Sequence, residues 1–148
     1  MAGPAISTAH AAWNGDLIHG SGSFTLGSGV AGELPVTWAT RTQRIPGSTS
    51  PEELLAAAHA ACYAMALSHT LAGKGTPASN LDVTASCAFA PVEGGWKIAT
   101  MELSVRGRVP GIDQASFAAA AKEGEQGCPV SNALRNNVEI TVKAELAS

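Results

Sequence analysis

The chain is poor in aromatic residues and in charge. Only 5% of its 148 residues are aromatic and 14% are charged, and the net charge is −3. It contains no run of five or more like charges, so it lacks the basic patches with which proteins bind nucleic acid or an anionic membrane. Because aromatic side chains are scarce, we expect a core of closely packed Ala, Val, Leu and Ile.

Export and membrane signals are missing as well. Residues 1–6 have no basic start followed by an apolar stretch, so we expect no secretory signal. The longest apolar stretch, residues 54–67, is interrupted by His59 and is too short to cross a bilayer, which predicts a central helix buried on most sides. We therefore expect a cytoplasmic protein, in a reducing compartment where paired cysteines are more often catalytic or metal-binding than structural.

The pattern of apolar and turn-forming residues predicts an α+β fold whose sheets are mostly antiparallel. A chain of this length can bury a core without disulfides, so we expect one domain over residues 1–148. Asn14-Gly15 predicts a type I′ hairpin turn and residues 93–95 predict a second hairpin. The predicted strands cover residues 7–13, 16–26, 34–41, 81–91, 96–108 and 138–142, and the predicted helices cover residues 51–71, 115–122 and 129–135.

The long helix has clear start and stop signals. Ser50 can cap it, Pro51 suits its first turn and Glu53 completes a capping box, while Gly73 predicts its end. Its faces are apolar nearly all round. In a small domain such a helix needs sheets around it or a second copy of itself.

The chain has three cysteines, and two of them, Cys62 and Cys128, lie 66 positions apart in suggestive settings. Cys62 is in the apolar helix, where it is either a small buried hydrophobe or a reactive thiol. His59 is three residues earlier on the same helix face and needs a partner, either a backbone carbonyl or a nearby thiolate. Cys87 lies in an apolar strand, so we interpret it as an inert packing residue.

Cys128 is placed at the start of a helix. Pro129 at the first helical position makes Cys128 the N-cap, where free N–H groups and the helix dipole stabilise an anion. Cysteine is a poor ordinary cap, so we favour a functional thiol here. A buried thiol and a helix-start thiol together indicate a nucleophile and its resolving partner.

Metal and phosphate chemistry are weakly supported. His59 and Cys62 supply only two metal ligands and no C-x-x-C pair occurs, so we predict no metal site. Residues 73–76 lack the upstream glycine of a phosphate-binding loop and follow a helix instead of a strand. We predict neither a metal nor an organic cofactor.

Two cysteine motifs closely resemble those of the OsmC/Ohr family of bacterial thiol peroxidases, in its OsmC branch. The motifs are P-E-E-L-L-A-A-A-H-A-A-C over residues 51–62 and G-C-P-V-S over residues 127–131. W-N-G-D over residues 13–16 and V-P-G-I-D over residues 109–113 are also similar to that family. The resemblance covers the whole chain in order.

The resemblance implies an intertwined homodimer, with antiparallel sheets wrapped around two long central helices. It also implies an arginine and a glutamate beside the peroxidatic cysteine, which by position are Arg41 and Glu52. Arg44 is an alternative for the arginine, and Glu53 is an alternative for the glutamate that orients it. Ten residues of straight helix separate Glu52 from Cys62 by about 15 Å, so either Arg41 partly bridges that gap, or the helix begins later or bends.

The function implied is reduction of organic hydroperoxides in oxidative or osmotic stress. Cys62 becomes a sulfenic acid, Cys128 condenses with it, and a dithiol or a lipoylated protein reduces the resulting disulfide. The expected apolar substrate pocket consists of Leu54, Leu55, Ala58, His59 and Met65. The alternative is a dimeric binding module for an apolar small molecule, with cysteines that are redox-sensing or silent. Neither function requires nucleic acid or a membrane.

Overall fold

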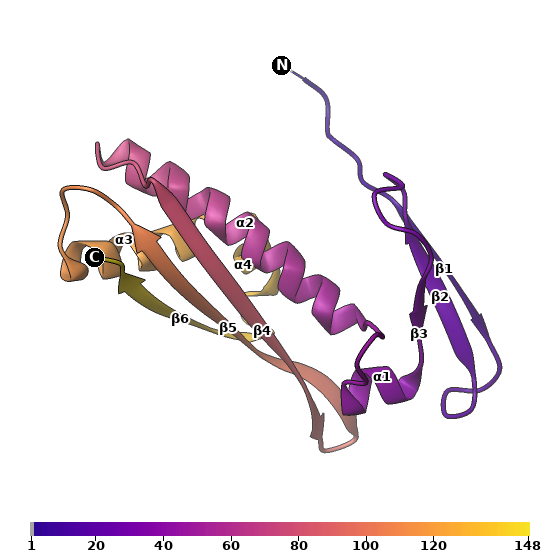
Figure 1. The fold of residues 1–148 in the computed structure, drawn as a ribbon. Helices are drawn as coiled ribbons and strands as arrows, with labels where there is room; N and C mark the ends of the chain where they lie inside the picture. Colours follow the sequence, from indigo (N-terminus) through magenta and orange to yellow (C-terminus); the bar gives the residue numbers. More distant parts are fainter. Residues whose placement is uncertain (1) are drawn as a thin grey trace. The chain divides into compact units, whose positions relative to one another are not determined.

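A computed structural model describes residues 2–148, which form two compact units, one ending at Pro51 and the other beginning at Glu52 (Figure 1). The first unit contains one three-stranded sheet and a short helix. Its strands are β1 (Ala9–Asn14), β2 (Ser21–Leu26) and β3 (Leu34–Val36), in the order β1-β2-β3 with antiparallel pairing.

The β1–β2 turn is longer than the two-residue turn that Asn14-Gly15 predicts. Asn14 pairs with Ser21, so six residues connect the strands. The Asp16 carboxylate accepts hydrogen bonds from the backbone N–H groups of Ile18 and His19, at 2.9 and 2.8 Å. These bonds stabilise a wider turn, so the prediction of a strand that begins at Asp16 was wrong, and β2 begins at Ser21. Gly15 does adopt a positive φ, of 89°.

The predicted strand over residues 34–41 is also wrong in its second half. The strand ends at Val36, and α1 (Trp38–Gln43) follows it directly. Thr37 caps this helix: its side chain accepts a hydrogen bond from the Thr40 N–H, and the Thr40 hydroxyl oxygen accepts one from the Thr37 N–H. The capping box uses threonine where glutamate or glutamine is usual. Because β-branched residues such as threonine are typical of strands, the sequence predicted a strand here.

The second unit begins with α2 (Pro51–Gly73), which confirms the predicted long helix. The helix ends at Gly73, as predicted, and Gly75 in the turn that follows has a positive φ, of 76°. The helix is not buried on most sides in the single chain, because its fully buried side chains repeat about every fourth residue along one stripe. They are Glu52, His59, Tyr63, Leu67 and Leu71.

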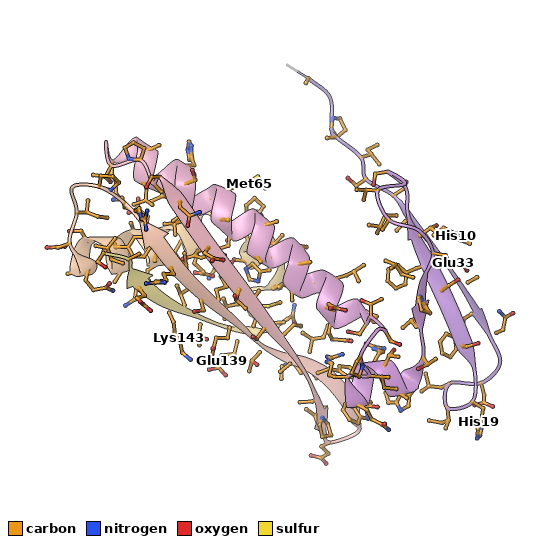
Figure 2. The ribbon with its side chains drawn as sticks, viewed as in Figure 1. His10, His19, Glu33, Met65, Glu139 and Lys143 are labelled. Atoms are coloured by element: carbon orange, nitrogen blue, oxygen red, sulfur yellow. The ribbon has the colours of Figure 1, made fainter. Side chains whose placement is uncertain are left out.

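The opposite face of α2 is exposed and mostly apolar. Ala57, Ala58, Ala61 and Met65 all lie on it, and Met65 is 68% exposed (Figure 2). At 23 residues, α2 is longer than the apolar stretch 54–67, and by length and composition the whole helix could cross a membrane. One such helix is weak evidence, since core helices of soluble proteins have the same composition.

A second three-stranded sheet completes the core of this unit. It consists of β4 (Asn80–Val92), β5 (Gly95–Arg108) and β6 (Glu139–Leu146), in the order β4-β5-β6. The predicted hairpin between β4 and β5 is confirmed, with Gly94 at φ 83° in its turn. β6 pairs with β5 in parallel because α3 (Gln114–Gln126) and α4 (Pro129–Leu134) form a crossover between them.

The inner face of this sheet packs against α2 and α3. On β5, Met101, Leu103 and Val105 are buried together with Phe117 of α3 and Leu67 of α2. The outer face carries cross-strand ion pairs such as that of Lys143 with Glu102, at 3.0 Å. Asp113 caps α3: its side chain accepts a hydrogen bond from the Ser116 N–H at 2.8 Å. The α+β fold predicted from the sequence is confirmed.

Candidate active site

Cys128 lies at the corner between α3 and α4. It is the N-cap of α4, with Pro129 in the first turn, which confirms the prediction from the Cys-Pro sequence. Its side chain makes no capping hydrogen bond and is fully buried. Its N–H donates to the carbonyl oxygen of Glu125 at 3.1 Å, which ties the corner to the end of α3.

The long helix brings Cys62 to the same place. The Cys128 thiol and the backbone N–H of Val130 both lie near enough to the Cys62 sulfur to shift the pKa of its thiol. Burial raises the pKa of the Cys62 thiol, the Val130 N–H opposes that rise, and Cys128 adds to it. Both cysteines are free, so the fold holds two reduced thiols near each other.

A second contact joins the same two helices. The His59 side chain is fully buried, and its Nε2 lies 2.6 Å from the hydroxyl oxygen of Ser131. Burial lowers the pKa of the His59 imidazole, although the nearby Glu125 carboxylate opposes that shift. His59 Nδ1 has no hydrogen-bond partner among residues 2–148. The histidine thus bonds to a serine hydroxyl, which is neither of the partners that we expected.

An ion pair between Glu125 and Arg135 stabilises the turn between α3 and α4 that carries Cys128. An Arg135 Nη2 lies 3.0 Å from the buried Glu125 carboxylate, and the Gln126 amide donates to the same carboxylate at 2.9 Å. The ion pair joins the end of α3 to the residue that caps the end of α4. The polar network of Ser131, Glu125 and Arg135 was missed from the sequence. The need of His59 for a partner was the signal that could have pointed to Ser131.

The first unit holds Arg41 beside an apolar cavity. Its guanidinium lies 5.9 Å from the centroid of the Trp38 ring, in the geometry of a cation–π contact. The cavity has a volume of about 310 Å³. It is lined by Trp13, Leu17, Val36, Thr37, Trp38, Arg41 and Pro51.

Arg44, the alternative to Arg41, donates hydrogen bonds to other residues of the first unit. It has a left-handed backbone, at φ 54°, and its Nη1 donates to the Thr40 carbonyl at 3.2 Å and to the Ser50 hydroxyl at 2.8 Å. These bonds hold Arg44 at the end of α1.

Glu52 and Glu53 differ sharply in exposure. Glu52 is fully buried in the first turn of α2, whereas Glu53 is exposed. Of the five residues expected to line a substrate pocket, Leu54 and Leu55 are half-buried, and Ala58 and Met65 are exposed. His59 points into the interior, toward Ser131.

Two further points from the sequence concern the third cysteine, Cys87, and the possibility of a metal site. Cys87 is half-buried on β4 and packs against the core cluster of the second unit. Within residues 2–148, the structure brings together no group of three or more His, Cys, Asp or Glu side chains that could hold a metal ion.

The fold and the thiol pair together define an α+β dithiol protein, whose two cysteines come from different helices. The family model described as OsmC-like protein matches residues 45–143. The chain belongs to this OsmC family.

Relatives match over most of the chain. Peroxiredoxin OsmC of Escherichia coli (strain K12) is 39% identical over 136 residues, which cover 92% of this chain and 93% of that protein. An organic hydroperoxide resistance protein of Xanthomonas axonopodis pv. citri (strain 306) is 34% identical over 95 residues, 64% of this chain and 65% of that protein. The crystal structure of the organic hydroperoxide resistance protein OhrB of Bacillus subtilis superposes with a TM-score of 0.70 at 28% identity, covering 95% and 98%.

Proposed function

We propose that this chain is a two-cysteine peroxidase that reduces organic hydroperoxides to alcohols, in defence against oxidative and osmotic stress. The observation that carries the proposal is the proximity of the Cys62 and Cys128 thiols. Relatives named peroxiredoxin and organic hydroperoxide resistance protein support a thiol-dependent peroxidase.

In the first step the Cys62 thiolate attacks the terminal oxygen of the hydroperoxide. The O–O bond breaks, the alkoxide takes up a proton and leaves as an alcohol, and Cys62 becomes a sulfenic acid. The half-buried Leu54 and Leu55, with Ala58 and Met65, are proposed as apolar surroundings for the substrate. Such surroundings favour organic hydroperoxides over hydrogen peroxide.

The first step needs a cation, because burial raises the pKa of the Cys62 thiol. Arg41 is proposed to stabilise the thiolate and the developing oxyanion, and Glu52 to orient Arg41. The bonds of Arg44 to Thr40 and Ser50 support Arg41 over Arg44. The burial of Glu52 supports it over Glu53, since a buried carboxylate requires a compensating partner.

In the second step Cys128 condenses with the sulfenic acid to give a disulfide, and an external dithiol reduces it. Cytoplasmic dithiols, including lipoylated proteins, are the proposed reductants, and the cytoplasm is the proposed location. We propose neither a metal nor an organic cofactor.

The proposed working unit is a homodimer. The exposed apolar face of α2 supports it, because a symmetric second copy would cover that face. We further propose that residues 1–148 function as one domain once the dimer has formed.

The alternative function is a dimeric module that binds an apolar small molecule. The cavity beside Arg41, with Trp13, Leu17 and Trp38 in its lining, is the observation that favours it. Such a module would be oxidised once by peroxide and would not turn over.

A turnover assay separates these functions. Cumene hydroperoxide and hydrogen peroxide are compared as oxidants, with dihydrolipoamide and then dithiothreitol as reductant. A peroxidase consumes many equivalents of cumene hydroperoxide, and fewer of hydrogen peroxide. Consumption of a single equivalent would favour the binding module.

The Cys128→Ser variant tests the role of each thiol in the same assay. It should react once, and dimedone should trap the sulfenic acid on Cys62. A free Cys62 thiol after one equivalent of cumene hydroperoxide would contradict the assignment.

A further inference from the structure

The helices that carry the thiols approach each other at two levels. At the first level the Cys62 thiol lies near Cys128 and the Val130 N–H, and at the second level His59 Nε2 lies 2.6 Å from the Ser131 hydroxyl oxygen. His59 precedes Cys62 by three residues, and Ser131 follows Cys128 by three residues. The second level therefore lies about one helical turn from the thiols on both helices.

The spacing gives the His59–Ser131 pair a mechanical effect. Three residues of helix advance by about 4.5 Å, so the two levels are separated along α2 by about that distance. With the neighbours of Cys62 alone, α4 could tilt about that sulfur. The His59–Ser131 pair adds a point one helical turn away, which limits the tilt and holds the Cys128 sulfur toward Cys62.

The bond between His59 and Ser131 is costly to break. The side chains of His59 and Ser131 are fully buried, so breaking the bond leaves polar atoms without water. The Glu125–Arg135 ion pair braces α3 against the end of α4 but does not replace this link to α2.

We propose that His59 and Ser131 are a positioning pair for the resolving step, which holds Cys128 within disulfide reach of Cys62. The proposal rests on the two-cysteine mechanism given above. In that step the Cys128 thiolate attacks the sulfur of the Cys62 sulfenic acid. The S–S bond forms, the S–O bond breaks, and hydroxide leaves and takes up a proton as water. No further oxidant is needed, because the hydroperoxide has already oxidised Cys62.

A thiol–disulfide equilibrium tests the pair without any peroxide. The reduced protein is equilibrated with glutathione buffers, and the fraction of Cys62–Cys128 disulfide is measured by mass spectrometry. Ser131→Ala should lower the effective concentration of the two thiols about tenfold or more, because small misplacements of reacting groups are costly. Tenfold corresponds to a potential about 30 mV more positive.

Tyr63→Phe is the matched control. The Tyr63 hydroxyl donates a buried hydrogen bond from α2 to the Ala121 carbonyl of α3 at 3.0 Å, so its loss weakens packing of the same helix without releasing α4. We expect the disulfide equilibrium of Tyr63→Phe to stay within about twofold of the native protein. His59→Gln, which keeps an amide near the position of Nε2, should retain most of the native equilibrium, whereas His59→Leu should lose it.

Kinetics give the second readout. Disulfide formation after one equivalent of cumene hydroperoxide should slow about tenfold in Ser131→Ala, with a longer-lived sulfenic acid on Cys62. Oxidation of Cys62 itself, measured in a Cys128→Ser background, should be unchanged by Ser131→Ala. Should Ser131→Ala not fold, the His59→Gln and His59→Leu pair makes the same comparison.

The outcomes separate this inference from the proposed function. Native disulfide formation at an unchanged rate and equilibrium in folded Ser131→Ala would overturn the positioning role alone. A native protein that forms the disulfide in glutathione but does not turn over hydroperoxide would overturn the peroxidase function alone. Failure of the native protein to form the disulfide in either experiment would overturn both.

Discussion

At Cys62, burial opposes the chemistry that we propose for it. The half-buried site and the neighbouring Cys128 both raise the pKa of the thiol, and within the second unit only the Val130 N–H acts in the other direction. The reactive anion must therefore be stabilised from elsewhere, which is the role proposed for Arg41.

The first prediction concerns the choice among the three cysteines. Cys62→Ser should abolish hydroperoxide turnover, because a serine hydroxyl is not ionised near neutral pH and is a poor nucleophile toward peroxide. Cys87→Ser is the control and should leave turnover nearly unchanged, since Cys87 packs on the inner side of β4. Retained activity in Cys62→Ser, or a large loss in folded Cys87→Ser, would refute these assignments.

The second prediction concerns His59 and pH. Its folded-state pKa lies below the ordinary value of 6.5, so its contribution to stability is fully present above about pH 6.5. That contribution is lost as the pH falls from there through the lower pKa of the folded state, because the unfolded chain binds the proton first. Denaturant unfolding between pH 8 and pH 5 measures the loss.

Variants assign that loss to one residue. His59→Gln should weaken the decline of stability with falling pH, whereas His69→Gln, at an exposed position of α2, should follow the native protein. Equal pH dependence in the native protein and His59→Gln would show that His59 is not the group responsible.

Among the elements, α2 and α3 approach each other unusually closely at Gly124. A Cβ atom at this position would lie 3.0 Å from the Leu67 Cα and 3.2 Å from the Leu67 Cβ. Because the nearest atom belongs to the backbone, the helices would have to separate to admit a side chain. The absence of a side chain at Gly124 thus brings α3, and the Cys128 corner that follows it, close to α2.

The third prediction tests that approach. Gly124→Ala should destabilise the protein by about 1–3 kcal/mol through overpacking, despite the better helix propensity of alanine. Gly73→Ala is the control, since nothing lies within 4 Å of its added Cβ, and it should be neutral or slightly stabilising. Thermal unfolding measures both variants, and equal melting temperatures would contradict the close-packing account.

The elements differ in how well the sequence predicts them. The Pro51 start of α2, the β4–β5 hairpin and the Cys128 N-cap follow from local chemistry, and all three were predicted correctly. The helix α1 was missed because its Thr37 cap resembles the end of a strand, and the first hairpin turn because Asp16 binds two backbone N–H groups. Those features depend on side-chain hydrogen bonds that composition and spacing do not reveal.

The candidate site also has a part that the sequence predicts and a part that it does not. The importance of Cys62 and Cys128 could be predicted because each motif has a local signature. Their proximity, and the bond of His59 to Ser131, span 66 and 72 positions. Only the packing of α2 against α4 brings them together, so single-residue patterns could suggest but not establish the pairing.

At the scale of the whole molecule, the proposed dimer depends on the exposed apolar face of α2. The fourth prediction is that the native protein sediments as a dimer at micromolar concentration. Met65→Lys should weaken that dimer, because it places a charge on the apolar face, whereas Glu93→Lys in the β4–β5 turn should not. A stable native monomer would sink the dimer proposal.

The proximity of the thiols also links oxidation to unfolding. A disulfide between Cys62 and Cys128 would close a loop across 66 positions and restrict the unfolded chain, which in the chain-entropy treatment stabilises the fold by about 4 kcal/mol. Peroxide would then act as a stabilising reagent, and the oxidised protein should melt several degrees above the reduced one. Conversely, heat or denaturant should make the same disulfide easier to reduce. The melting temperature would then report the fraction of the protein that is in the disulfide form.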